Sequence, residues 1–163
     1  PHASSSAASD VYKRQALNTL RLEKSFGIWN NEFMQAYTPG ETGLSRWISR
    51  GKNVEFVGKT PALKELSEGK KTLQKTLITL EIKDAEVEAN GYEPIWSKNN
   101  KRIGMTTSGG YGHNVDKSLA MAFVEPEFSE PGIELKTHIV GKEKSCVVLG
   151  NSPWDPDGSR MRS

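Results

Sequence analysis

Residues 107–118, TSGGYGHNVDKS, bring several residue types that could do chemistry into a short stretch. Gly109, Gly110 and Gly112 could leave backbone amides free to cradle a phosphate, and His113 could act as a general base. The same stretch could also do no more than turn the chain between two strands. The elements that precede and follow it decide among these interpretations.

Neither chemical interpretation of the glycine stretch finds its required partner, a following helix for a phosphate cradle or a nucleophile for a catalytic base. A phosphate cradle usually forms where a strand leads into the N-terminus of a helix, but strands are predicted on both sides here, at 102–107 and 118–124. The spacing fits neither GxGxxG nor GxxxxGKS. His113 has Asp116 nearby in sequence but no activated Ser or Cys beside it. We therefore expect a strand–loop–strand crossover, and we assign no catalytic residue.

Few other residues are candidates for covalent or metal chemistry. Cys146 lies in the apolar run CVVLG and is predicted to be a core residue. As the only cysteine it allows no internal disulfide, which suits a reducing, cytoplasmic compartment. Cys146 with His113 and His138 does not make a metal-ligand set, so no metal is expected.

The overall charge and hydropathy argue against two classes of partner. The net charge is only +2 over 163 residues, which gives no reason to expect binding to nucleic acid or to a membrane surface. No apolar run approaches the roughly 20 residues of a membrane span. The length corresponds to one domain or slightly more, at roughly 100–200 residues per domain.

Residues 1–15, PHASSSAASDVYKRQ, differ in character from the rest of the chain. Ser5 to Gln15 match, residue for residue, one reading frame of a common transposon-based sequencing adapter. We therefore interpret residues 1–15 as a non-native, disordered segment. On this interpretation the native sequence enters at Ala16, inside a longer protein. A disordered natural N-terminus is the alternative.

Residues 16–70 have a helical and loop-rich pattern. A helix is predicted over 16–26, followed by a loop rich in Asn, Pro and Gly and by a short strand near 44–48. A second helix is predicted with Thr60 as its N-cap and Gly69 as its stop.

Residues 71–163 consist of short runs rich in β-branched and aromatic residues. The runs are LQKTLITLEI, GYEPIWS, KRIGMTTS, SLAMAFVE, IELKTHIVG and KSCVVLG, and turn clusters such as SKNN separate them. Short strands at roughly 8–12-residue spacing indicate a small antiparallel barrel or sandwich. The predicted fold class is therefore α+β, with the helical part preceding the β-domain.

Two groups of side chains could bind a ligand. Trp29, Phe33 and Tyr37 lie in a loop beside amide side chains, where they could stack on a flat heterocycle or fold inward. Arg160 or Arg162 could hold an acidic ligand near the C-terminus, or belong to a frayed basic tail. From these residues alone, both alternatives stay open.

Several short motifs occur in a fixed order from Ala16 onward. They are TLRLE at 19–23, WN at 29–30, TPGE at 38–41 and FVGK at 56–59. The stretches EPIW, KRIGMTTSGGYGHNVDKSLAMAFV, PGIEL and PWDPDGSRMR follow them. In this order the chain resembles the C-terminal part of the glycine cleavage T-protein (aminomethyltransferase) family. The stretches LEKSFGIW, SGGYGHNVDKS and WDPDGSRMR are most similar in sequence to the folate-binding region of dimethylglycine and sarcosine dehydrogenase-like proteins.

The resemblance implies a domain organisation and a function. Residues 16–70 would be the end of a folate-binding central domain, and 71–163 a C-terminal β-barrel packed on its own upstream domain. The parent enzyme would oxidise an N-methyl group with FAD in its N-terminal part and transfer the carbon to tetrahydrofolate. True T-proteins have an arginine at the position of Leu17, which favours the dehydrogenase branch. The alternatives are a stand-alone aminomethyltransferase, a dimethylsulfoniopropionate demethylase, and a non-catalytic barrel that buttresses the folate domain.

The resemblance also implies three folate-binding residues. Trp29 aligns with the family's ligand-stacking aromatic residue, Arg160 lies near a C-terminal ligand position, and Tyr111 could edge the site from the barrel side. The family's catalytic aspartate would lie upstream of Ala16. We therefore expect residues 16–163 to supply one wall of the site and to be inactive alone.

Overall fold

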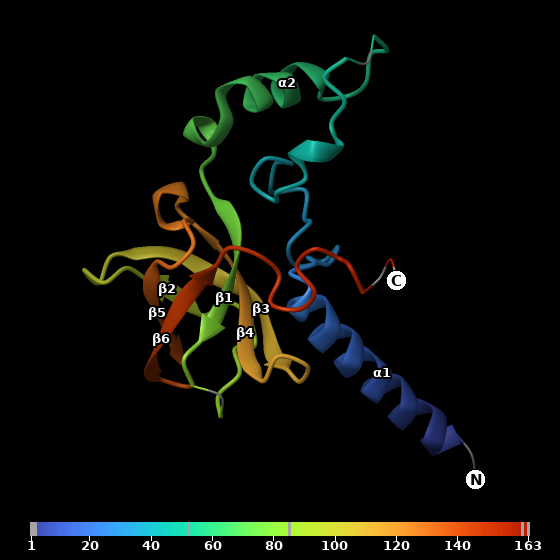
Figure 1. Cartoon of the computed structure of the whole chain (residues 1–163), viewed down its shortest axis with the longest axis vertical. Helices are drawn as coiled ribbons and strands as arrows, with labels where there is room; N and C mark the ends of the chain where they lie inside the picture. Colours follow the sequence, from blue (N-terminus) through green and yellow to red (C-terminus); the bar gives the residue numbers. More distant parts are fainter. Residues whose placement is uncertain (1–2, 52, 85, 161, 163) are drawn as a thin grey trace.

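The computed structural model describes residues 3–51, 53–84, 86–160 and 162 of the chain. These residues form a closed barrel of six antiparallel strands in the order β1–β4–β3–β2–β5–β6. Helix α1, Ala3–Glu23, lies against the outside of the barrel at its C-terminal end, and α2, Lys59–Glu68, extends away from the barrel (Figure 1). The α+β fold with a small antiparallel barrel is therefore confirmed.

Each of the predicted β-rich runs forms one strand of the barrel. The strands are β1 Thr76–Ile82, β2 Pro94–Trp96, β3 Arg102–Gly112, β4 Lys117–Val124, β5 Glu134–Ile139 and β6 Lys142–Leu149. Strand β1 pairs with β4 on one side and β6 on the other, which closes the barrel. Closure leaves no free sheet edge among these strands.

The barrel interior is filled by apolar side chains. Successive residues of a strand point to opposite faces, so alternate positions such as Ile78, Leu80 and Ile82 of β1 point inward. Cys146 of β6 belongs to the same cluster, and burial raises the pKa of its thiol to about 12. The prediction that Cys146 is a core residue is confirmed.

The glycine stretch is not the loop that the sequence predicted. Strand β3 continues through it to Gly112, and only residues 113–116 form the turn to β4. A Cβ atom on Gly109 would lie 2.2 Å from the backbone oxygen of Ala89, and one on Gly110 would lie 3.2 Å from Leu22 of α1. The prediction failed because these glycines allow neighbouring segments to approach a strand closely, which local propensity does not reveal.

The helical part also differs from the prediction in its details. Residues near 44–48 form a short 3₁₀ helix, Ser45–Trp47, and not a strand. The N-cap of α2 is Gly58, with φ 82°, and not Thr60, whereas the predicted stop at Gly69 is confirmed. Two further 3₁₀ turns, Gly69–Thr72 and Pro126–Phe128, connect elements of the chain.

Helix α1 begins earlier than expected. It includes residues 3–15, where the sequence predicted a disordered segment and no helix, while residues 1–2 lie outside the described residues. Residues 3–15 contain several alanines and neither Gly nor Pro, which favours a helix. The side chains of Val11 and Tyr12 are exposed, so these two residues do not anchor the helix to the barrel. No helix within the described ranges is long and apolar enough to cross a membrane.

We expect Gly109→Ala to lower the free energy of unfolding by about 2 kcal/mol, because the added methyl group would overlap backbone atoms of Ala89. Gly51→Ala is the matched control, since an added Cβ there meets nothing within 4 Å. Urea denaturation of both variants checks the prediction. Equal stability of the two variants would contradict it.

Candidate functional site

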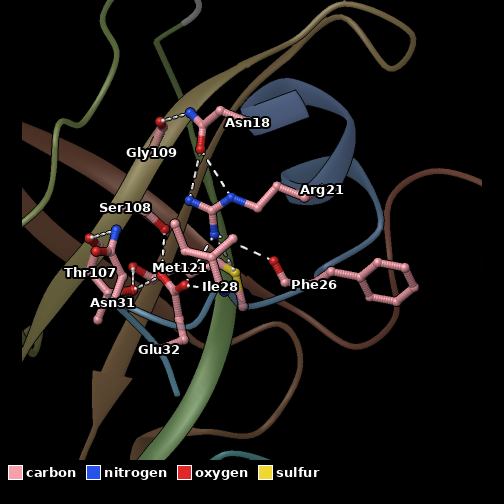
Figure 2. A network of polar contacts seen from close by, with 10 residues as sticks. All are labelled: Asn18, Arg21, Phe26, Ile28, Asn31, Glu32, Thr107, Ser108, Gly109 and Met121. Atoms are coloured by element: carbon pink, nitrogen blue, oxygen red, sulfur yellow. Dashed lines mark hydrogen bonds and ion pairs between the residues drawn. The ribbon is translucent and has the colours of Figure 1, made fainter. Parts of the chain in front are cut away.

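A network of buried polar side chains joins the end of α1, the loop at residues 24–33 and strand β3 (Figure 2). The Glu32 carboxylate is fully buried. Its Oε2 atom accepts hydrogen bonds from the backbone N of Ile28 at 2.8 Å and from Arg21 Nη1 at 3.2 Å. Its Oε1 atom accepts from Thr107 Oγ1 at 2.5 Å and Ser108 Oγ at 2.6 Å. Both oxygens are therefore satisfied by donors from separate parts of the chain.

Arg21 is the cationic partner in this network. Its Nε and Nη2 atoms donate to Asn18 Oδ1 at 3.0 and 2.7 Å, and Nη1 lies 3.4 Å from the Phe26 carbonyl oxygen. Asn18 in turn donates from Nδ2 to the Gly109 carbonyl at 3.0 Å. Burial lowers the pKa of the Arg21 guanidinium, and the charge of Glu32 opposes that shift. The pair therefore fixes α1 against β3 as well as the loop.

Glu23, a second buried carboxylate, ends helix α1. It accepts hydrogen bonds from the backbone N of Asn114 at 2.7 Å and from Asn114 Nδ2 at 2.6 Å. The carbonyl oxygen of Glu23 accepts from the backbone N of Trp154 at 2.9 Å, and Lys24 Nζ donates to the Asp155 carbonyl at 2.6 Å. The β3–β4 turn and the C-terminal tail are thereby attached to the same helix end.

Trp29 lies on the loop that Glu32 holds. Its side chain is 80% exposed, although the adjacent Ile28 amide is bound to Glu32. On the other side of Trp29, Asn31 Nδ2 donates to the Thr107 carbonyl at 3.4 Å. Trp29 is therefore an exposed aromatic residue on a loop with a fixed base.

Tyr111 lies near the end of β3, beside the turn that Glu23 holds. Its hydroxyl donates a hydrogen bond to Asp116 Oδ1, which raises the pKa of Tyr111. Its ring meets His113 edge-on, with 5.1 Å between ring centres. His113 itself is exposed, and no group of metal-binding residues occurs in the part of the chain that the structure describes.

Arg160 lies on the C-terminal tail. Its guanidinium carbon is 4.5 Å from the centre of the Trp154 ring, and its backbone N donates to Asp155 Oδ1 at 3.2 Å. Arg160 and Tyr111 thus lie on two segments that Glu23 attaches to one helix end, whereas Trp29 lies on the loop held by Glu32. Their predicted contacts with folate stay a prediction.

The sequence-based reasoning did not identify the residues that organise this region. These residues are Asn18, Arg21, Glu23 and Glu32. No structural role was predicted for any of them, and some were named only as letters of a family motif. One signal was available, because Asn18 and Arg21 are three residues apart and so share a helix face with Leu22 close by. Polar residues beside a buried leucine on a helix indicate buried hydrogen bonds.

Beside this network lies a hollow of about 380 Å³, here called the β3 hollow. Its walls come from the loop after α1, the segment before β1, the turn before β2, and strands β3 and β4. They comprise Asn31, Met34, Tyr37, Gln74, Lys75, Tyr92, Arg102, Ile103, Gly104, Met105, Thr106, Thr107, Phe123 and Glu125. Trp29, Tyr111 and Arg160 do not line it, so it is distinct from the predicted folate contacts.

The turn that carries Tyr92 is held by Glu93. The Glu93 carboxylate accepts hydrogen bonds from the backbone N of Asn90 at 2.8 Å, from that of Gly91 at 2.9 Å, and from Thr106 Oγ1. Burial raises the pKa of Glu93, but these hydrogen bonds outweigh it and hold that pKa below its ordinary value.

Comparison with known proteins identifies the barrel. Residues 75–155 match the family described as "Glycine cleavage T-protein C-terminal barrel domain". These residues belong to that family. A solved structure of glycine cleavage system aminomethyltransferase T from Bartonella henselae has the same fold, with a TM-score of 0.77 at 23% identity. The match covers 85% of this chain and 38% of that protein.

Relatives of the barrel domain extend the similarity toward the N-terminus. Mitochondrial dimethylglycine dehydrogenase of Rattus norvegicus is 38% identical over 140 residues, which are 86% of this chain and 16% of the rat protein. The Homo sapiens protein of that name is 36% identical over the same shares. An aminomethyltransferase of Clostridium botulinum (strain Langeland) is 31% identical over 134 residues, 82% of this chain and 35% of that enzyme. The chain thus spans a minor part of each relative.

We expect Glu32→Ala to lower the free energy of unfolding by about 3–5 kcal/mol, because it leaves the Arg21 guanidinium buried without its partner. Glu134→Ala is the matched control. It removes an ion pair with Lys98 at 2.7 Å whose side chains are both mostly exposed, and should lower stability far less than Glu32→Ala. Chemical denaturation measures both, and similar losses would show that the buried pair has no special weight.

Stability should also depend on pH through Glu93. Because its folded pKa is lowered, its contribution is present above the ordinary pKa and is lost as the pH falls through the lowered value. After solvent screening we expect the free energy of unfolding of the wild type to exceed that of Glu93→Gln by less than about 1 kcal/mol at neutral pH. This difference should disappear under acid conditions. Denaturant titrations from neutral to acid pH check this prediction, and Glu88→Gln, a change at an exposed carboxylate, is the control. A gap that widens on acidification would contradict it.

Proposed function

We propose that this chain acts as the C-terminal part of a tetrahydrofolate-dependent one-carbon enzyme of the dimethylglycine or sarcosine dehydrogenase type. In that enzyme an upstream flavin domain would oxidise an N-methyl group. The higher identity to rat dimethylglycine dehydrogenase, 38% against 31% for the Clostridium aminomethyltransferase, supports this branch. So does Leu17, where the family's T-proteins carry an arginine. FAD would be held upstream, and no residue of this chain is assigned to it.

The observation that carries the folate proposal is the combination of exposure and fixation at Trp29. An exposed tryptophan is usually mobile, but here the loop base is bound to a buried carboxylate. An exposed ring on a fixed backbone suits stacking on a flat heterocycle, since the loop backbone loses little further conformational entropy on binding. Tetrahydrofolate would supply the nitrogen atoms that accept the one-carbon unit. The chain's own residues would bind and orient it.

Arg160 and Tyr111 would complete the wall of the folate site. A guanidinium group pairs well with carboxylates, so Arg160 suits the acidic end of the ligand. Its position over the Trp154 ring and the attachment of its tail to Glu23 restrict where that charge can lie. Tyr111 would contact the ligand from the barrel side.

A stand-alone aminomethyltransferase is the second candidate, and the similarity to the Bartonella henselae and Clostridium botulinum proteins favours it. A third, of another class, is a barrel that only buttresses the neighbouring domain. Large apolar side chains are exposed on α1 and on the segment between α1 and α2, including Leu17, Leu20, Trp47 and Val57. We propose that these pack against an upstream domain of the parent protein. A cytoplasmic location stays a prediction, since the rat and human relatives are mitochondrial by name.

In the parent protein we expect Trp29→Ala to weaken tetrahydrofolate binding about tenfold, equivalent to about 1.4 kcal/mol of lost stacking. Arg160→Ala should weaken it by a similar factor through loss of a charge-assisted contact. Isothermal titration calorimetry of each variant measures the change. Lys142→Gln is the control, because Lys142 is exposed on β6 and has no proposed role in binding or packing.

Unchanged affinity in both Trp29→Ala and Arg160→Ala would leave only the buttressing role. The absorbance spectrum of the purified parent protein separates the two enzyme classes. Bound flavin is expected for the dehydrogenase, and a parent without flavin would favour the aminomethyltransferase.

A further inference from the structure

The β3 hollow is lined by aromatic rings and by cationic side chains. Tyr37, Tyr92 and Phe123 supply the rings, while Lys75 and Arg102 supply the charges. Its volume of about 380 Å³ falls within the usual range of small-molecule sites, roughly 300–1,000 Å³. Aromatic walls with a few charged groups are the lining expected of a ligand site.

The aromatic wall of the hollow is rigid. The Tyr37 ring stacks on Phe123 with 3.7 Å between ring centres and 21° between planes. Phe123 belongs to β4 and is buried, and it pairs with Met105 of β3 and Leu77 of β1. Tyr37 is therefore held by the barrel and presents a preformed surface to a flat ligand.

Tyr92 has an unfavourable backbone conformation that independently points to a binding role. Its φ is 68°, in the left-handed region that a bulky residue adopts only at a cost in stability, yet its side chain is 69% exposed. Its backbone N donates to the Thr106 carbonyl at 2.8 Å, and Glu93 holds the rest of the turn. The turn thus holds the backbone of an exposed aromatic residue at the hollow, at a cost in stability that burial does not offset.

The two cations at the hollow have no carboxylate partner in the described part of the chain. Lys75 Nζ lies 5.8 Å from the centre of the Tyr37 ring, and Arg102 Nη2 lies 3.9 Å from the Met105 sulfur. Glu125, the acidic residue of the lining, is already paired with Lys101 at 2.5 Å. Lys75 and Arg102 can therefore both meet an anion.

We propose that the β3 hollow binds a planar aromatic or heteroaromatic molecule that carries a carboxylate or phosphate group. Tyr37 and Tyr92 contact the ring of this ligand, and Arg102 and Lys75 contact its anionic group. This site goes beyond the proposed folate contacts, because Trp29, Tyr111 and Arg160 lie outside its lining. Asn31 and Thr107 line the hollow and are hydrogen-bonded to each other, so a bound ligand also touches the base of the Trp29 loop.

Two small probes test the site in the full chain: 4-aminobenzoate, which carries a carboxylate, and adenosine monophosphate, which carries a phosphate. Ligand-observed NMR titration should give a dissociation constant in the millimolar range or tighter for at least one of them. The probe that binds more tightly identifies the anionic group that the site prefers.

Variants of the lining locate the binding. Arg102→Gln should weaken it about tenfold by removing the charge, and Tyr92→Gly should weaken it by removing the ring while keeping a residue that adopts positive φ readily. Lys142→Gln, which removes an exposed charge on β6, should leave affinity within about twofold of wild type. Thermal unfolding of each variant confirms that it is folded.

Absence of binding by both probes would overturn the proposal. Equal affinity in wild type, Arg102→Gln and Tyr92→Gly would also overturn it, since the probes would then bind elsewhere. Neither result bears on the Trp29 and Arg160 titrations with tetrahydrofolate, so the two proposals fail separately.

Discussion

The arrangement of the helix, the loop and the barrel depends on the burial of one carboxylate, that of Glu32. Moving an ionised group out of water costs several kcal/mol unless a counter-charge and hydrogen-bond donors surround it. Here Arg21 supplies the charge, and a loop amide and two β3 hydroxyls supply further donors. These donors belong to segments up to 76 residues from Glu32 in sequence. A displacement of any of them leaves a buried charge unsatisfied, so their relative positions are tightly restricted.

The same restriction explains the glycines of β3. Once Arg21 and Asn18 hold α1 against the strand, a Cβ atom at Gly110 would lie 3.2 Å from the side chains of Asn18 and Leu22, so both would have to shift to admit it. Gly112 faces Glu23 in the same way, at 3.1 Å. The glycine stretch therefore serves packing between helix and strand, and no phosphate or catalytic base is required to explain it.

Local pattern predicted the barrel but not the junction. Runs such as TLITLEI and SLAMAFV are rich in β-branched and apolar residues, so the local composition of each run predicts a strand. The SGGYG part of β3 has poor strand propensity and is a strand only because β4 and the helix lie against it. Trp29 could be proposed as a ligand contact from a family resemblance. The roles of Arg21 and Glu32 could not be predicted from the sequence. Their partners are distant in sequence, and the helix face that Arg21 shares with Asn18 does not indicate which distant residues meet it.

The filled interior of the barrel restricts where any ligand can bind. Six strands enclose little space, and here Leu80, Ile95 and Leu135 with their neighbours occupy it. A ligand of this chain must therefore lie on the outer surface, where rigidity has to come from elements packed against the barrel. The end of α1 provides it, because Glu32 fixes the loop of Trp29 and Glu23 fixes the turn and the tail. Both the predicted folate contacts and the β3 hollow lie around this junction, which is where polar side chains can be held in place on an otherwise apolar scaffold.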